Sequence, residues 1–235
     1  MKYKRASKIW LDAAFLFLMG MVLSMGGKAA WAASVDELIR DSVEVLRGMT
    51  KAEDVESMAD VIAGAQAVAF VPSLVKAGFV VGGTYGEGLI LRREGGKWYG
   101  PSFYNLGGGS LGLQLGAQKV SLVLVVKNKK GVEAFLGSKV KLGGDIAVAA
   151  GPVGRRAEAA TDAQIKASIY SYSMSKGLFA GFSLEGSVIS ISVKRNEEYW
   201  KKKISASDAL KQRAQDKRIQ PLLQELDALA ARAKK

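Results

Sequence analysis

The sequence predicts an α+β fold: an antiparallel, strongly twisted or partly closed sheet of about 6–8 strands, with N-terminal helices and a C-terminal helical tail. Three observations support this prediction. Helix-capping motifs gather before residue 66, short apolar runs bounded by glycines fill the middle of the chain, and helical patterning returns after residue 195. Strands do not alternate with long helices, which argues against a doubly wound parallel sheet.

Two capping motifs open the helical part of the chain. Residues 34–37 (SVDE) have the S-x-x-E pattern of a capping box and predict a helix that ends near Met49. Residues 50–53 (TKAE) repeat the pattern and predict a second helix to about Gly64. Residues 33–66 hold eight acids and three bases, so this helical pair is acidic.

The middle of the chain predicts strands joined by tight connections. Glycines bound the apolar runs, and residues 94–97 (EGGK) predict a turn. Leucines at 111, 113 and 115 alternate with Gly and Gln, so this strand has one apolar face and one nearly bare face that could lie beneath a helix or an acyl chain. Strands are predicted at 67–71, 79–81, 89–91, 120–126, 142–153, 164–175 and 178–193, with one or two helical turns at 131–137.

The last part of the chain is predicted to be helical over 196–203 and 205–233. Pro221 is expected to break or kink the second helix, because proline removes a helical hydrogen bond. The resulting domain division is a signal peptide at 1–32, one domain at 33–200, and a basic helical tail at 201–235.

The first 32 residues have the features of a secretory signal peptide. A basic start (Lys2, Lys4, Arg5, Lys8) precedes an apolar run at 13–25, and residues 30–32 (AWA) place small residues before a cut at Ala33. The apolar run is shorter than the roughly 20 residues of a spanning helix; an uncleaved anchor is the alternative. Cleavage removes five bases and one acid, which leaves 29 bases and 21 acids, or +8. We therefore expect a periplasmic or secreted protein, with membrane association as an option.

The composition of the 235-residue chain excludes several kinds of chemistry. It contains no Cys and no His, so it has no disulfide, thiolate nucleophile, Ser-His-Asp triad or imidazole metal site. Residues 73–76 and 173–176 match S-x-x-K, but the S-D-N and K-T-G elements of that chemistry do not occur. The glycine-rich stretches 82–88 and 107–116 lead into predicted strands, whereas a nucleotide loop leads into a helix.

Carboxylates are sparse in the strand region, and their spacing places no two of them together. The candidates are Asp145, Glu158, Asp162 and Glu185. Turn and capping bonds account for such residues, and a carboxylate-only site for a divalent ion has no support. We predict that the protein is not an enzyme and uses no cofactor or metal.

The net charge of +12 indicates an anionic partner. The strongest cluster spans 127–156, with seven bases against two acids, and residues 194–203 add five bases, two acids, Tyr199 and Trp200. Bases beside amphipathic rings suit a membrane surface, where each Lys or Arg contributes about 1 kcal/mol. A solvated face that keeps the protein soluble is the alternative. An exported chain is not expected to meet nucleic acid.

Four blocks resemble the SYLF-domain family. They are VPSLVKAGFVVGGTYGEGLIL (71–91), GPSFYNLGGGSLGLQLGAQ (100–118), GGDIAVAAGPVGRRAEAATDAQ (143–164) and SYSMSKGLFAGFSLEGSVI (171–189). The resemblance covers about 36–200 and implies a lipid-binding domain and no enzyme; bacterial members are mostly exported, and eukaryotic relatives bind phosphoinositides and associate with the actin machinery. Most motif positions are glycines, which indicates a structural signature. The chain departs from the pattern at Arg156 and at the basic residues 192–195 (SVKR).

The resulting hypothesis is an exported, non-enzymatic protein that binds anionic phospholipid headgroups at the cell-envelope membrane surface. Bases hold the headgroups and aromatic rings dip into the interface. The candidate lipid-binding residues are Lys76, Lys127, Lys129, Lys130, Lys139, Lys141, Arg155, Arg156, Tyr199 and Trp200. The alternative is a periplasmic protein-interaction scaffold that uses the same domain or the 205–233 helix to hold an envelope protein. A hydrolase that uses Ser73 and Lys76 ranks third.

Overall fold

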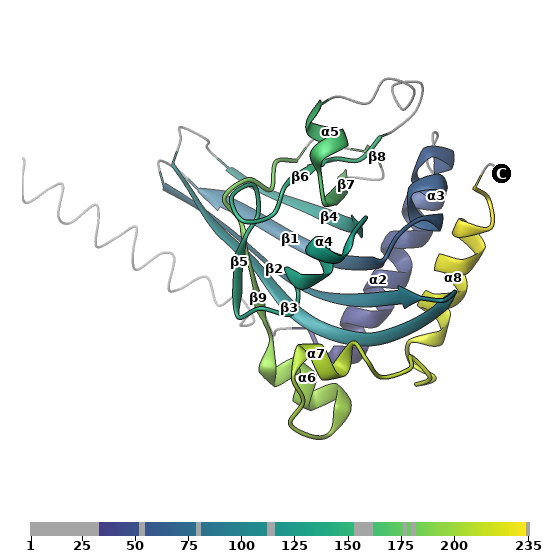
Figure 1. The fold of residues 1–235 in the computed structure, drawn as a ribbon. Coiled ribbons are helices and arrows are strands. Elements are labelled where there is room, and N and C mark those ends of the chain that lie inside the picture. The colour runs from purple at the N-terminus through teal and green to yellow at the C-terminus, as the bar shows by residue number, and fades with distance from the viewer. Residues whose placement is uncertain are drawn as a thin grey trace, which may run out of the picture. The chain divides into compact units, whose positions relative to one another are not determined.

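The computed structural model describes residues 33–51, 55–78, 81–111, 116–152, 162–175, 178–179 and 182–233. The chain divides into two compact units, Met1–Ala33 and Ser34–Lys235. In the second unit a strongly curled sheet packs against helices, which confirms the predicted α+β class (Figure 1). Within the described residues, no helix has the length and apolarity needed to cross a membrane.

The two predicted N-terminal helices are present. Helix α2 (Val35–Thr50) begins at the predicted capping box: the Ser34 hydroxyl accepts from the Glu37 N–H, and the Glu37 carboxylate accepts from the Ser34 N–H. Helix α3 (Val55–Ala63) follows. Thr50 was predicted to cap the second helix, and this is wrong. It is the last residue of α2, and its hydroxyl donates to the carbonyl of Arg47. Glu53 lies outside the described residues.

The sheet has nine strands among the described residues. They are β1 (Ala67–Gly78), β2 (Val81–Glu94), β3 (Lys97–Leu111), β4 (Gly116–Val126), β5 (Lys139–Lys141), β6 (Val148–Ala150), β7 (Ile169–Ser175), β8 (Leu178–Phe179) and β9 (Val188–Ile191). Eight follow the order β5-β9-β3-β2-β1-β4-β7-β6, and β8 pairs with β7. The pairing is antiparallel except between β6 and β7. Strands β1–β3 form a meander, and the predicted 94–97 turn joins β2 to β3. Strand β4 pairs with the other side of β1.

Both faces of the central sheet are buried. Alternate residues of a strand point to opposite faces, so Val68 and Phe70 of β1 join one core and Ala67 and Ala69 join the other. Helices α2, α3 and α8 (Gln220–Ala230) cover the first face. The second face is covered by α4 (Lys129–Glu133), by the chain that follows it, and by Leu210.

Three predicted strands between residues 142 and 193 are wrong in extent. The predicted 142–153 strand is interrupted by a turn, where Gly143 has φ +80° and Asp145 accepts from the Lys141 N–H; only Val148–Ala150 is a strand. The predicted 164–175 strand begins with helix α5 (Asp162–Lys166). The predicted 178–193 strand contains two short strands, β8 and β9. Leu111 ends β3, and residues 112–115 lie outside the described part.

The C-terminal segment folds back on the N-terminal helices. It contains α6 (Val193–Trp200), α7 (Ala206–Ala209) and α8. The helical stretch predicted at 205–233 is therefore interrupted, but the interruption spans residues 210–219, before Pro221. Pro221 lies in the first turn of α8, where its missing N–H costs no hydrogen bond. It therefore begins a helix and does not kink one. Helix α8 contacts α2 and α3, so the segment after residue 200 belongs to the same compact unit.

Candidate functional site

The structure distributes the predicted basic residues over several surfaces. Lys129 and Lys130 are exposed on α4, and Lys139 and Lys141 are exposed on the edge strand β5. Lys76 lies half-buried on β1, with its Nζ 5.9 Å from the centroid of the Phe182 ring. Arg155 and Arg156 lie outside the described residues. These bases therefore do not form one cluster in the described part of the chain.

Lys127 has structural partners. Its Nζ donates to the Tyr170 hydroxyl at 2.9 Å and lies 4.2 Å from the centroid of the same ring. The carbonyl of Gln164 is also within 3.4 Å of Nζ. Lys127 therefore ties the end of β4 to β7 and to α5, and it is a poor candidate for holding a headgroup.

Tyr199 and Trp200 pack inside the protein. Tyr199 is only 4% exposed, lies 5.5 Å from Phe103 between ring centroids, and is covered by the guanidinium of Arg218. Trp200 is half-buried and donates its indole N–H to the carbonyl of Pro101 at 3.0 Å. Because neither ring is free to enter a lipid interface, we leave both out of the proposed surface.

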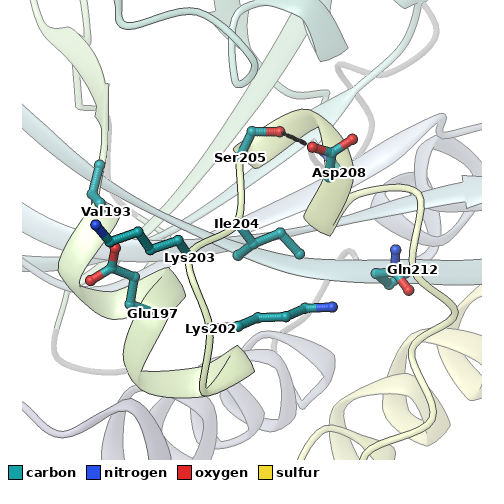
Figure 2. A pocket seen from close by; sticks show the side chains of 8 residues that line it. All are labelled: Val193, Glu197, Lys202, Lys203, Ile204, Ser205, Asp208 and Gln212. Atoms are coloured by element: carbon teal, nitrogen blue, oxygen red, sulfur yellow. Dashed lines mark hydrogen bonds between the residues drawn. The ribbon is translucent and has the colours of Figure 1, made fainter.

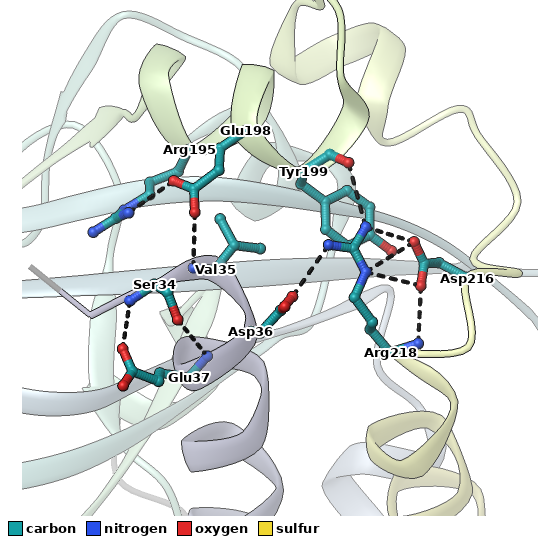
Figure 3. A network of polar contacts seen from close by, with 9 residues as sticks. All are labelled: Ser34, Val35, Asp36, Glu37, Arg195, Glu198, Tyr199, Asp216 and Arg218. Carbon is teal, nitrogen blue, oxygen red and sulfur yellow. Dashed lines mark hydrogen bonds and ion pairs between the residues drawn. The ribbon is translucent and has the colours of Figure 1, made fainter.

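Two arginines join the C-terminal segment to the start of α2 (Figure 3). The buried guanidinium of Arg195 donates to Glu87 on β2 and to Glu198 on α6, and Glu198 also accepts the Val35 N–H. Burial acts to lower the pKa of Arg195, but its hydrogen bonds to Glu198 and Glu87 outweigh burial and raise that pKa. Arg195 is therefore a permanent cation inside the fold.

The second arginine of this network is Arg218. It donates to both carboxylate oxygens of Asp216 and to Asp36 at the start of α2. The hydrogen bond from Arg218 holds the pKa of Asp216 below its ordinary value. The network accounts for part of the positive charge that the sequence assigned to the surface.

One end of the sheet extends beyond its helical cover. Strands β1–β4 run past α2, α3 and α8, and they end at the β1–β2 and β3–β4 connections (Figure 1). We call the described residues of this end the sheet tip: 75–78, 81–86, 107–111 and 116–120. The tip continues the sheet face that α2 covers, because its Tyr85 follows Leu89 and Glu87 at two-residue steps along β2.

An exposed apolar pair lies on this face. Val75 of β1 and Tyr85 of β2 are register partners, and they are 42% and 56% exposed. Gly107 of β3 pairs with Tyr85, and Lys119 of β4 pairs with Val75, so a row of Gly, Tyr, Val and Lys crosses four strands. The Tyr85 hydroxyl contacts Glu87 at 3.4 Å. Partial burial and this carboxylate raise the pKa of Tyr85, so the ring stays neutral at physiological pH.

The neighbouring row of the same face is almost bare. It consists of Gly109, Gly83, Ala77 and Ala117, which are partners on consecutive strands. A Cβ atom at Gly83 or at Gly109 would meet nothing within 4 Å. Internal packing therefore does not require glycine at these positions. Glycine inside a strand often marks the close approach of a ligand to the backbone.

The charge of the sheet tip is wholly positive. Its residues include Lys76 and Lys119 and no Asp or Glu. The sequence pattern indicated Lys76 as a binding residue but did not indicate Val75, Tyr85 or Lys119. The available signal was the glycine-rich alternation of the 82–88 and 107–116 stretches, which indicated a bare strand face without showing that four strands share it.

An open hollow of about 500 Å³ lies beside α6 and α7 (Figure 2). Its lining includes Lys202 and Lys203 together with Glu197 and Asp208, so the charges balance. The Ser205 hydroxyl donates to the Asp208 carboxylate and accepts a hydrogen bond from the Asp208 N–H. The hollow therefore has little electrostatic preference for an ion.

Within the described residues, the side chains of the enzyme-like motifs are not arranged for catalysis. Ser73 and Lys76 lie on strand β1, whereas the S-x-x-K chemistry needs a helix start. Asp145 caps the Lys141 turn, and Glu158 lies outside the described part. In that part, no group of three acidic side chains is placed to hold a metal ion.

Comparison with known proteins defines the class. A family model described as Ysc84, Las17-binding protein actin regulator, matches residues 107–229. The chain belongs to this family, whose shared domain is the SYLF domain, and the match extends into the C-terminal segment beyond residue 200.

Several curated proteins are similar to parts of this chain. An SH3 domain-containing protein of Schizosaccharomyces pombe is 40% identical over 164 residues, which are 67% of this chain and 38% of that protein. Human SH3 domain-containing YSC84-like protein 1 is 38% identical over 154 residues, 65% of this chain and 45% of that protein. LAS seventeen-binding protein 3 of Saccharomyces cerevisiae is 39% identical over 134 residues, 55% and 29% respectively. The chain thus spans less than half the length of these relatives.

Proposed function

We propose that this protein is a non-enzymatic, lipid-binding protein of the cell envelope that docks on anionic membranes through the sheet tip. The observation that carries the proposal is the exposed pair Val75 and Tyr85 at an end of the sheet that has lysines and no acids. An aromatic ring with a polar hydroxyl suits the headgroup region of a bilayer. Membership of the SYLF family and the export signal predicted at 1–32 support the same function.

The expected affinity is modest. Full burial of a large apolar side chain contributes about 1.5–3 kcal/mol, and Val75 and Tyr85 are already partly buried. Each lysine near an anionic surface adds about 1 kcal/mol. Lys119 lies on the face of the apolar pair, whereas Lys76 points to the opposite face of the tip, so Lys119 contributes most of this charge. Binding should be reversible and sensitive to salt. The exposed bases on α4 and β5 add to the general positive field.

The test is co-sedimentation of residues 33–235 with vesicles. We expect binding to vesicles with anionic lipid, weaker binding at high salt, and little binding to zwitterionic vesicles. The double variant Val75→Ser/Tyr85→Ser should bind at least fivefold more weakly. Val193→Ser/Ile165→Ser is the matched control, since both residues are exposed apolar side chains outside the tip.

A second variant separates the tip from the basic cluster that the sequence indicated. Lys129→Glu/Lys130→Glu changes two exposed bases on α4. If this variant abolishes binding while the tip variant binds normally, the tip is the wrong surface. Equal binding by all variants would contradict both assignments.

The second candidate function is a protein-interaction module, which the family description as a Las17-binding actin regulator favours. An apolar contact between proteins should persist at high salt, whereas docking on an anionic surface should weaken. Salt-resistant capture of an envelope protein, together with no vesicle binding, would support this candidate.

A further inference from the structure

A second pocket lies far from the sheet tip. It has a volume of about 550 Å³. Its walls come from the C-terminal end of β2, from α4 and Leu136, and from α7 and the two residues that follow it. This volume is within the range of small-molecule sites, about 300–1,000 Å³.

The pocket has more bases than acids. Arg92, Arg93, Lys129 and Lys211 line it, against Glu94 and Glu133. The Arg93 guanidinium is engaged elsewhere, because it donates to the Ala63 carbonyl and lies over the Trp98 ring, and Lys211 also contacts Asp208 at 3.6 Å. These bases come from three separate segments of the chain, which is why the run of bases at 127–156 identified only Lys129. A pocket with converging positive charge concentrates anions.

Arg92 is held in place by the protein. Its Nε donates to the carbonyl of Leu210 at 3.0 Å, one Nη donates to Glu94 at 3.0 Å, and its guanidinium lies 5.0 Å from the centroid of the Tyr99 ring. Among the described residues, no acceptor is bound to its other terminal nitrogen, Nη1. An arginine that is already positioned loses little side-chain freedom when it binds an anion.

The floor of the pocket is apolar. Val132 and Leu210 are buried beneath it, and Leu136 is 37% exposed at its wall. A free inorganic ion would leave this apolar surface in contact with water. The combination of bases and an apolar wall therefore fits a ligand that carries both a negative group and an apolar body.

We propose that this pocket binds an organic phosphate ester. Arg92, Lys129 and Lys211 hold the phosphate, whose two negative charges match several bases better than a carboxylate does, and the apolar body lies against Leu136. The ester comes either from a single lipid molecule or from a water-soluble phosphate ester; the recognition chemistry is the same.

The position of the pocket separates it from membrane docking. Arg92 lies seven residues beyond Tyr85 on the same strand, which is about 23 Å at 3.3 Å per residue. When the tip contacts a bilayer, the pocket is directed away from it and stays open to water. The inference thus goes beyond the proposed function and does not depend on it.

Calorimetric titration of residues 33–235 tests the proposal with three probes: phenyl phosphate, inorganic phosphate, and dihexanoyl phosphatidate below its micelle concentration. We expect saturable binding of at least one ester, at least tenfold tighter than that of inorganic phosphate. Tighter binding of the phosphatidate indicates a lipid source, and tighter or equal binding of phenyl phosphate indicates a soluble source. No saturable binding of either ester at millimolar concentration would overturn the proposal.

Variants locate the site. Lys129→Gln/Lys211→Gln should weaken ester binding at least tenfold, and Leu136→Ser should weaken it several-fold while leaving inorganic phosphate unchanged. Lys166→Gln/Lys217→Gln is the matched control, since it removes two exposed lysines outside both the pocket and the sheet tip; its ester binding should equal that of the unmodified protein. Equal losses in the two double variants would overturn the pocket assignment. Failure of ester binding with intact vesicle binding would overturn the pocket alone.

Discussion

Val75 on β1 and Tyr85 on β2 are register partners on the same face of the sheet, and both are exposed to solvent. A few residues along the same strands, Phe70 and Leu89 form an equivalent pair that is completely buried under the N-terminal helices. The same apolar face is therefore core at one end of the hairpin and surface at the other. Exposed apolar side chains at a defined place on a sheet indicate an interaction surface.

Replacing Tyr85 with Trp should report directly on membrane contact. The indole of Tyr85→Trp should enter the headgroup region, so its fluorescence should shift to shorter wavelength when anionic vesicles are added and should be quenched by brominated lipid. The same substitution at Val193, which is 60% exposed on α6, is the control and should show neither change. A spectrum at position 85 that stays that of a water-exposed indole would contradict docking through the tip.

Lys119 should contribute to docking by charge alone. Its register partner is Val75, so its ammonium lies beside the apolar pair. Removal of one base from an anionic surface costs about 1 kcal/mol, or about fivefold in partitioning. Lys119→Gln should therefore bind anionic vesicles about fivefold more weakly at low salt, and the difference should disappear at high salt. Lys166→Gln, an exposed base on α5, should have little effect.

Glycines of one strand should differ sharply in their tolerance of a methyl group. A Cβ at Gly88 would lie 2.4 Å from the carbonyl oxygen of Phe70 and 2.6 Å from the Tyr104 ring, so Gly88→Ala must displace backbone. Overpacking of this kind costs about 1–3 kcal/mol or more, which is about 2–12 °C in Tm for a domain of this size. Gly83→Ala on the tip meets no atom within 4 Å and should leave Tm almost unchanged.

Thermal unfolding followed by circular dichroism measures both variants. A large loss of Tm for Gly83→Ala would show that the bare row of the tip is packed against something, and it would contradict an exposed tip. The Gly88 result tests the packing between β1, β2 and Tyr104.

Local sequence signals predicted the fold class, the first helix and the turn between β2 and β3 well. The Ser34 capping box and the Gly95-Gly96 turn are formed within a few residues, so the chain itself specifies them. The region after residue 142 was predicted poorly, because β5, β6, β8 and β9 have two to four residues each and depend on pairing with distant strands. Strands this short have no alternation that a sequence can display.

The candidate site was harder to predict than the fold for the same reason. Tyr199 and Trp200 look like interface rings in the sequence, yet helix α6 turns them towards Phe103 and Pro101. Tyr85 and Lys119 are 34 positions apart and become neighbours only through Val75 on the strand between them. Surfaces that are assembled across strands are invisible to linear spacing.

Arg195 should be important for stability. It is 7% exposed, and it bonds Glu87 on the sheet and Glu198 on its own helix. Removing one partner of a buried ion pair costs about 3–5 kcal/mol, because the other charge stays buried. We expect Arg195→Ala to lower Tm by about 6–20 °C. The double variant Arg195→Met/Glu87→Leu should recover much of the loss, since it leaves no unpaired charge on β2. A double variant that is less stable than Arg195→Ala would contradict this explanation.

The Asp216–Arg218 pair should make stability depend on pH in the acid range. The hydrogen bonds from Arg218 lower the pKa of Asp216 in the folded state. A carboxyl group whose folded pKa is depressed contributes its full stability above its unfolded pKa of about 3.9, and it loses that contribution as pH falls further. Because both side chains are partly exposed, the contribution at neutral pH should be about 1 kcal/mol, or about 2–4 °C in Tm.

Asp216→Asn should therefore lower Tm at pH 7, and the gap to the unmodified protein should close as the pH is lowered from about 4 to 2. Thermal unfolding at a series of pH values measures this gap. Asp41→Asn is the matched control, because its contact with Arg40 is long and exposed, and it should show no gap at any pH. A gap for Asp216→Asn that is equally large at pH 7 and pH 2 would mean that the residue acts through its shape and local backbone bonds.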